Sequence, residues 1–252
     1  MSDANRRATK AERKEQARLE REEIRQRIAR RNRNRTIGTV LVVVAVAAVV
    51  IAFVVIPSDD EQVVSQLGDP ADIVAQADRA ATEASCEDVR TVDPYPGGDQ
   101  THVEDAVPDL STYPSTPPAS GPHEATTLPA GVYESPPAIG PLIHSLEHGA
   151  SIVWYDPAAP QAEIDRITAF YEQAPGDVAA GLDRVIVAPY DYDGPAGSLL
   201  DGARMALVAW HRVRTCADPS LEVALDFTTR FSAPASLGRD YEGEAPEAGL
   251  PF

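Results

Sequence analysis

Lysine does not occur in this sequence after residue 14, and cysteine and methionine each occur only twice in its 252 residues. Several sequence motifs are missing as well. Without G-x-x-x-x-G-K-[ST] or G-x-G-x-x-G, the chain has neither a P-loop nor a dinucleotide-binding turn. Without C-x-x-C or G-x-S-x-G, it has neither a thiol redox pair nor the nucleophile elbow of the α/β-hydrolases. These absences argue against the common nucleotide-binding and thiol redox functions.

Basic residues are scarce over most of the chain, which has a formal net charge of −17. Residues 1–36 contain 13 Lys and Arg against six Asp and Glu, whereas residues 37–252 contain nine Arg and 33 acidic residues. So acidic a body would repel a phosphate backbone, and we therefore expect no nucleic-acid partner. The basic head is typical of a juxtamembrane segment that faces anionic lipid.

One long apolar run separates the basic head from the acidic body. Residues 36–56 contain no charged side chain in 21 positions, enough for a helix to span roughly 30 Å of hydrocarbon. A cleaved signal peptide would have a shorter apolar region and a small-residue cleavage site, and neither is present. We therefore predict an uncleaved transmembrane helix. Arginines before it and acidic residues after it place the N-terminus in the cytoplasm and residues 57–252 outside.

These features divide the chain into five predicted regions. They are a basic cytoplasmic tail, helical or disordered, at residues 1–35; the transmembrane helix at 36–56; a stalk or linker at 57–85; an extracytoplasmic domain at 86–232; and a flexible C-terminal tail at 233–252. The prediction is a single-pass protein of the cell membrane. Its expected partners are the lipid bilayer and, as a second candidate, another envelope or membrane protein.

Both cysteines, Cys86 and Cys216, fall in the part predicted to lie outside. In an oxidising compartment an even pair most simply forms one disulfide bond. Such a bond would tie the start of the domain to its end.

The domain begins with a proline-rich segment. Residues 91–141 contain 11 prolines, which exclude long helices and central strands. A segment of this length is either disordered or wraps around the domain. Aromatic and histidine residues spread along it, such as Tyr95, Tyr113 and Tyr133, favour an ordered wrap.

Regular elements follow the proline-rich segment. Apolar patterns predict strands at 150–155, 184–188 and 204–213, and helices at 162–173 and 221–231. Because a helix connects the first two strands, we expect them to be parallel. The predicted fold class is α+β: an N-terminal transmembrane helix and one small domain with a mixed sheet and a long wrapping segment.

Histidine is concentrated in one part of the chain. Four of the five histidines fall within 47 residues: His102, His123, His144 and His148. On a helical turn, the four-residue spacing of His144 and His148 would put both imidazoles on one face, as in some metal sites. We predict these four as metal ligands, with Glu147 as a carboxylate that orients them. Histidine with a thioether, from Met205, would suit copper, and histidine with a carboxylate would suit zinc.

Two other interpretations of the same residues stay open. The histidines could form a structural network that caps carbonyl groups and holds the proline-rich segment, and His211 beside Trp210 is expected to be a packing residue. Alternatively Ser120 or Ser145 could act as a nucleophile with a neighbouring histidine. Residues adjacent in sequence rarely reach the required geometry, so we lean against an enzyme.

Two local sequences carry a resemblance to a known family. They are PPASGPH at residues 117–123 and HSLEHG at residues 144–149, with His102 and Tyr113 upstream. Together they resemble the DUF3105 family of bacterial proteins of unknown function, over roughly residues 86–232. The matching positions are His102, Tyr113, Pro117, Pro118, Ser120, Gly121, Pro122, His123, His144, Glu147, His148 and Gly149. The resemblance implies an anchored envelope protein and no particular activity.

Three functions are therefore carried forward. The first is a membrane-anchored extracytoplasmic domain that binds copper or zinc through its histidines. The second is an envelope interaction module with structural histidines and a rigid proline-rich surface. The third is a Ser/His or metal-dependent hydrolase.

Overall fold

The computed structural model of the chain describes residues 68–104, 106–173 and 184–251. These all lie in the second of two compact units, residues 1–58 and 59–252. Among the residues described, no helix is both long enough and apolar enough to cross a membrane. The predicted transmembrane segment and the basic tail before it lie outside the described residues.

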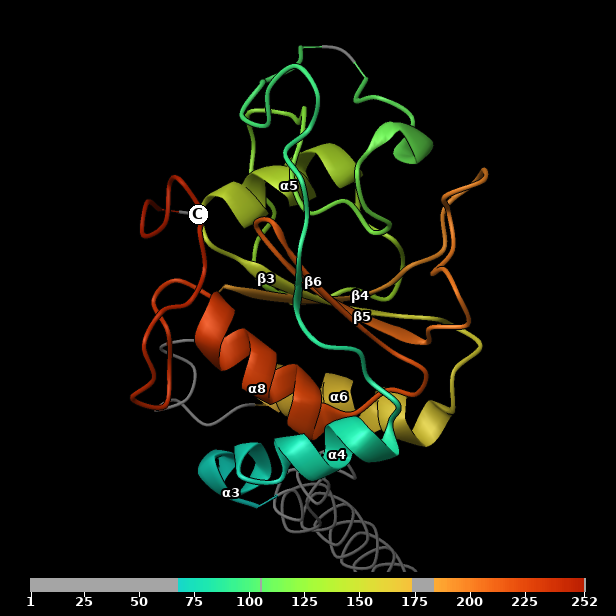
Figure 1. The fold of residues 1–252 in the computed structure, drawn as a ribbon, viewed down its shortest axis with the longest axis vertical. Coiled ribbons are helices and arrows are strands. Elements are labelled where there is room, and N and C mark those ends of the chain that lie inside the picture. The colour runs from blue at the N-terminus through green and yellow to red at the C-terminus, as the bar shows by residue number, and fades with distance from the viewer. Residues whose placement is uncertain (1–67, 105, 174–183, 252) are drawn as a thin grey trace, which may run out of the picture. The chain divides into compact units, whose positions relative to one another are not determined.

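The described chain forms one mixed sheet with helices on both faces (Figure 1). Its elements are α3 (Pro70–Val74), α4 (Ala77–Glu83), β1 (Arg90–Thr91), the 3-10 helix η1 (Leu110–Thr112), β2 (Gly131–Val132), α5 (Ile139–Glu147), β3 (Ser151–Tyr155), α6 (Gln161–Gln173), β4 (Val185–Pro189), β5 (Met205–Ala209), β6 (Arg212–Cys216) and α8 (Leu221–Phe231). The six strands have the order β1-β6-β5-β3-β4-β2. Strands β2, β4 and β3 are parallel, and β5, β6 and β1 continue the sheet in antiparallel pairs. This is the predicted α+β class with a mixed sheet.

The central strands are buried on both faces. Side chains of a strand alternate between the two faces of the sheet. Val153 and Leu207 thus point into one apolar cluster, and their neighbours Ile152 and Val208 into another. Helices α3, α4, α6 and α8 cover the first face, and α5 with the proline-rich segment covers the second (Figure 1).

Most of the predicted regular elements are confirmed, with one correction. The strand expected at 204–213 is two strands, because the chain reverses at Trp210–His211 to pair β5 with β6. His211 adopts a left-handed backbone with φ of 55° there. Neither residue at this turn is a glycine or an asparagine, the usual signals of a tight hairpin. The parallel pairing of β3 with β4 is confirmed.

The region expected to be a stalk contains two short helices that belong to the domain. Ile73 of α3 and Ala80 and Ala81 of α4 are buried in the same cluster as α8. Asp69 caps α3 by accepting a hydrogen bond from the amide of Ala71. The small apolar surface of an alanine-rich helix suffices because α8 lies directly against it.

The disulfide bond between Cys86 and Cys216 is present, as predicted. It joins the turn that follows α4 to the last residue of β6, positions 130 residues apart in the sequence. It therefore holds the helical layer that precedes the sheet against the strand that ends it.

The C-terminal segment, residues 233–251, returns over the domain, where a separate flexible tail was expected. It passes α8 and ends beside α5 (Figure 1). Backbone hydrogen bonds join Ala233 to Gly149 and Glu247 to Glu147, at 2.8 and 3.1 Å. Its acidic residues also form ion pairs with arginines of β6 and α8. No apolar pattern marks this segment, because backbone and charged contacts hold it.

Candidate metal centre

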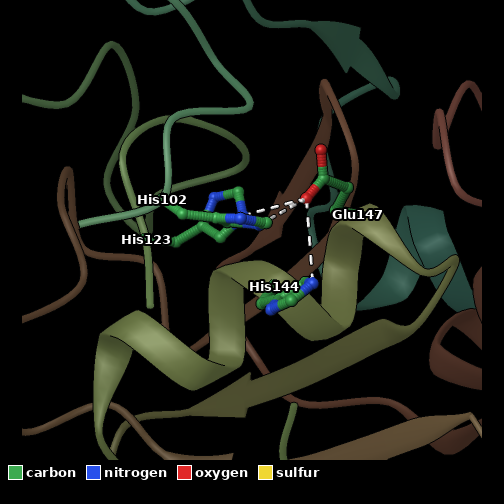
Figure 2. Close-up of side chains that lie close together, drawn as sticks. All are labelled: His102, His123, His144 and Glu147. Carbon is green, nitrogen blue, oxygen red and sulfur yellow. Dashed lines mark ion pairs between the residues drawn. The ribbon is translucent and has the colours of Figure 1, made fainter. Parts of the chain in front are cut away.

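Helix α5 supplies two of the polar groups of the site. Its apolar side, with Leu142, Ile143 and Leu146, is buried against the sheet. His144 and Glu147, three residues apart, project together from another side of the helix (Figure 2). Their side chains are 8% and 2% exposed, so both polar groups lie away from bulk water.

The helix ends where a side chain cannot fit. Gly149 has a φ of +91°, and a Cβ atom there would lie 2.6 Å from the Cβ of Ala233 in the returning C-terminal segment. Glycine is therefore required both for the left-handed backbone and for the close approach of the two segments.

The proline-rich segment supplies the other two groups. His102 and His123 lie side by side because the amide of Val103 donates to the carbonyl of His123, and the amide of His123 to that of Thr101. These bonds measure 2.8 and 3.0 Å. The two rings lie edge to face with centroids 4.9 Å apart.

A tyrosine and a glycine fix the backbone next to His123. The hydroxyl of Tyr113 donates to the carbonyl of Pro122 at 2.7 Å. Gly121 has a φ of +126°, and a Cβ atom there would lie 2.8 Å from the ring of Tyr113. The loop is thus ordered and wraps the domain as expected.

Three imidazoles surround one carboxylate oxygen. Oε2 of Glu147 lies 2.9 Å from Nε2 of His123, 3.7 Å from Nε2 of His102 and 4.0 Å from Nε2 of His144 (Figure 2). All four potential ligand atoms lie within 4.8 Å of one another. Ligand atoms at about 2.0–2.1 Å from a tetrahedral metal ion are separated from one another by roughly 3.3 Å. This separation falls within the range of distances between the four atoms described here.

The hydrogen bonding of His123 determines which of its nitrogens is bare. Nδ1 lies 2.7 Å from the carbonyl oxygen of Gly121, which can only accept, so Nδ1 carries the proton. In the neutral ring Nε2 then presents a lone pair to the carboxylate of Glu147. Although they are close, these two buried atoms are not aligned for a hydrogen bond, and neither has another hydrogen-bond partner. A lone pair and a carboxylate oxygen 2.9 Å apart repel each other unless a cation lies near both.

Burial and the neighbouring charges shift the pKa values of the two groups on α5. Burial lowers the pKa of His144, and charges on His123, His148 and His102 lower it further, against the opposite effect of Glu147. Burial alone would raise the pKa of Glu147, but the contact with His123 and the charges of the three histidines outweigh it and lower that pKa. A neutral imidazole and an ionised carboxylate are the forms that bind metal ions.

His148 belongs to a second group of polar atoms. Its Nε2 lies 3.0 Å from Nε2 of His144 and 3.0 Å from Oε2 of Glu247. The structure thus brings Glu147, rather than His148, together with His102 and His123. Glu247 was missed because it lies 99 positions after His148, in a segment with no pattern that predicts packing.

Other candidate residues lie outside these two groups. Met205 is fully buried in the cluster on the opposite face of the sheet from α5, so its thioether does not join the site. The hydroxyl of Ser145 is within hydrogen-bond distance of backbone atoms of Leu128 and Pro141. These contacts give Ser145 a structural role in holding α5 against the proline-rich segment.

The fifth histidine and the remaining serine meet at one aspartate. Oδ2 of Asp99 lies 2.8 Å from Nε2 of His211, and the hydroxyl of Ser120 donates to Oδ1 of Asp99 at 3.1 Å. The carboxylate stands between the serine and the histidine, whereas a nucleophilic serine needs the histidine as its own neighbour. The arrangement fits an anchor for the proline-rich segment.

Comparison with known protein families gives a match. The family described as "Protein of unknown function (DUF3105)" matches residues 107–246, more than half of the chain. The match covers His123, the two α5 residues His144 and Glu147, and most of the C-terminal segment. It begins five residues after His102. No curated protein and no solved structure matches the chain. The matched sequence and the residues it covers show that this chain belongs to the DUF3105 family.

Proposed function

We propose that the domain binds one divalent transition-metal ion through His102, His123, His144 and Glu147. This set, called the inner site below, provides three imidazole nitrogens and one carboxylate oxygen. Such a set matches the number and kind of ligands that zinc takes in proteins, and imidazole also suits cupric copper. Cuprous ion is a poor fit because no sulfur joins the described group.

The lone-pair contact between His123 and Glu147 carries the proposal. Burying an ionised carboxylate and a bare imidazole nitrogen without partners costs several kcal/mol. A metal ion between these atoms would satisfy both and would also use the neighbouring nitrogens of His102 and His144. The acidic body supports the same conclusion, because its net negative charge raises the local concentration of cations.

A proton is the alternative cation. If Nε2 of His123 were protonated, it would form an ion pair with Glu147, and the cluster would be structural. The positions of His102 and His144 argue against this alternative, because two further imidazole nitrogens face the same carboxylate oxygen at 3.7 and 4.0 Å. An ion pair needs only one of these three imidazoles, whereas a metal ion uses all of them.

Metal analysis of the full-length chain tests the proposal. The protein would be purified without chelators or affinity metals, analysed for its elements, and titrated with Zn²⁺ and with Cu²⁺ against a chromophoric chelator. We expect one ion per chain. The affinity of His123→Asn should be lower by about 100-fold or more, because replacing even a residue that only hydrogen-bonds to a metal ligand typically lowers metal affinity by about 10–100-fold. The asparagine amide keeps a donor for the carbonyl of Gly121 and removes the ligand nitrogen.

His211→Asn is the matched control. It makes the same substitution at a histidine that pairs with Asp99 and lies outside both polar groups, and asparagine tolerates the left-handed backbone there. This variant should bind metal as the unchanged protein does. A wild-type chain that binds neither ion, or a His123→Asn variant with unchanged affinity for both, would rule the proposal out.

The second part of the proposal is the location of the domain outside the cytoplasmic membrane. It is supported by the uncharged run at residues 36–56, by the basic residues before it, and by a disulfide bond, which forms in oxidising compartments. The test is protease treatment of spheroplasts. Residues 57–252 should be digested without lysis, and full protection until lysis would contradict this location.

A further inference from the structure

We propose a second metal position, the outer site, formed by His148, Glu247 and His144. It shares His144 with the inner site, so the ion can occupy one position or the other. This inference rests on the proposed function and extends it from a binding site to a pair of positions between which one ion is passed.

The ligand atoms of the outer site are as close together as those of the inner one. Nε2 of His148 lies 3.0 Å from both Nε2 of His144 and Oε2 of Glu247, and all three atoms lie within 4.8 Å of one another. Nδ1 of His148 lies 2.8 Å from the carbonyl oxygen of Pro251, to which it must donate. Nε2 is therefore the bare nitrogen of the neutral ring, as in His123, and it points at the other two ligand atoms.

The C-terminal segment is held in place at this point, so the position of Glu247 is fixed by the fold. The amide of Glu247 donates to the carbonyl of Glu147, the last residue of α5, at 3.1 Å. The guanidinium of Arg184 donates to the carbonyls of His148 and Leu250, at 2.6 and 2.7 Å, and so joins the helix end to the segment. A backbone bond from Leu250 to the carbonyl of Glu247 closes the turn.

His144 cannot serve both positions at once. The nitrogen that lies 4.0 Å from Glu147 is the same Nε2 that lies 3.0 Å from His148. One nitrogen lone pair binds one metal ion, so an ion in the inner site takes this ligand from the outer site. The full chain should therefore bind a single ion at any moment.

The two positions differ in exposure. In the outer site the side chains of His148 and Glu247 are 12% and 39% exposed. In the inner site those of His123 and Glu147 are 0% and 2% exposed, and His102, at 47%, is the one ligand that reaches solvent. Because the outer site has three ligands and is more exposed to solvent, it should bind the ion more weakly than the inner site and exchange it with solution faster. Transfer requires only an exchange of ligands around His144, with no change in the charge or oxidation state of the ion.

The experiment titrates the full-length chain with Zn²⁺ in a background that has lost one of the four inner-site ligands. The His123→Asn variant should still bind one ion, with an affinity about 100-fold or more below that of the unchanged chain. Adding Glu247→Gln should abolish this residual binding. Adding Glu244→Gln instead should leave it intact, because Glu244 lies on the same segment but pairs with Arg212. Circular dichroism would confirm that each variant folds, and Glu147→Gln offers a second inner-site background.

The outcomes separate this inference from the proposed function. Residual binding that depends on Glu247 and not on Glu244 supports the outer site. If the wild-type chain binds one ion and both inner-site variants bind none, the outer site is overturned and the inner site stands. The same conclusion follows if the residual binding survives Glu247→Gln. Two ions bound together by the unchanged chain overturn the sharing of His144. A wild-type chain that binds no zinc overturns both proposals for that ion.

Discussion

At the scale of single residues, the carbonyl groups beside the histidines are as important as the histidines themselves. The carbonyl of Gly121 orients His123, and that of Pro251 orients His148. In each ring a backbone acceptor holds the proton on Nδ1 and leaves Nε2 bare and directed at a carboxylate. This arrangement gives the site its chemistry before any ion is bound.

Glu147→Gln should separate metal binding from stability. The glutamine amide can donate to the bare Nε2 of His123 and removes the buried unpaired charge, so the metal-free protein should gain about 1–3 kcal/mol in its free energy of unfolding. Loss of the anionic ligand should weaken zinc binding by about 100-fold or more. Urea unfolding without metal and a zinc titration measure the two effects. A large loss of stability with unchanged zinc affinity would favour a structural ion pair.

Gly121→Ala should disturb the loop that carries His123. The substitution places a Cβ against the ring of Tyr113 and forces an alanine into a backbone conformation with φ of +126°. We expect a loss of about 2–3 kcal/mol in the free energy of unfolding, together with weaker zinc binding.

Gly131→Ala provides the control for Gly121→Ala. Gly131 also has a positive φ, of +144°, but no neighbour lies near its Cβ position. It should therefore show only the cost of the backbone conformation. Equal losses in the two variants would remove the clash with Tyr113 from the explanation.

At the scale of elements, one ion pair connects the two long helices on the face opposite α5. Nη2 of Arg166 on α6 lies 2.5 Å from Oε1 of Glu222 on α8. Burial would raise the pKa of Glu222, but the hydrogen bonds and positive charge of Arg166 outweigh it and lower that pKa. Because the pKa of Glu222 is lower in the folded protein, the pair stabilises the fold at pH values above 4.5, the ordinary pKa of a glutamate. This stabilisation is lost as the pH falls through the pKa of Glu222 in the folded protein.

Glu222→Gln should therefore destabilise the domain by about 1–2 kcal/mol at pH 7. The difference from the unchanged protein should shrink as the pH drops below 4.5, because Glu222 itself then becomes neutral. Urea unfolding between pH 3 and 7 measures this dependence. Glu163→Gln removes a more exposed and more distant carboxylate from the same arginine, at 3.6 Å, and should have little effect. A constant difference at every pH would contradict the assignment.

Several elements could be predicted because their own residues specify them. The apolar runs of β3 and β4 and the helical spacing of α6 and α8 depend on local sequence alone. Helix α5 was recognised only as a turn, because Gly140 and Pro141 near its start conceal its pattern. The hairpin at Trp210–His211 was missed because pairing between β5 and β6 imposes a backbone that these residues do not prefer.

At the scale of the whole molecule, the disulfide and the C-terminal segment connect parts of the chain that are far apart in sequence. The pairing of Cys86 with Cys216 was predictable because the sequence contains only these two cysteines. The position of Glu247 was not, because long-range backbone contacts determine it. The four histidines could thus be named as ligands from the sequence, but the part taken by Glu247 and the division of the ligands into two groups required the fold.

Replacing Cys86 and Cys216 together by alanine should lower the free energy of unfolding by about 4–5 kcal/mol. This value follows from the loop-entropy model for a link of this span. Thermal unfolding of the unchanged protein with and without reductant should show the same loss as the double variant. An unfolding temperature that is unaffected by reduction would contradict the prediction.

The returning C-terminal segment also determines how the protein can be handled in the laboratory. Pro251 holds the ring of His148 through its carbonyl oxygen. A peptide fused after residue 252 would begin two positions from that contact. A C-terminal hexahistidine tag would therefore place six additional imidazoles beside the outer site, where they would compete for the ions under study. Purification tags belong at the N-terminus of this protein, and metal contents measured with a C-terminal tag should be repeated after its removal.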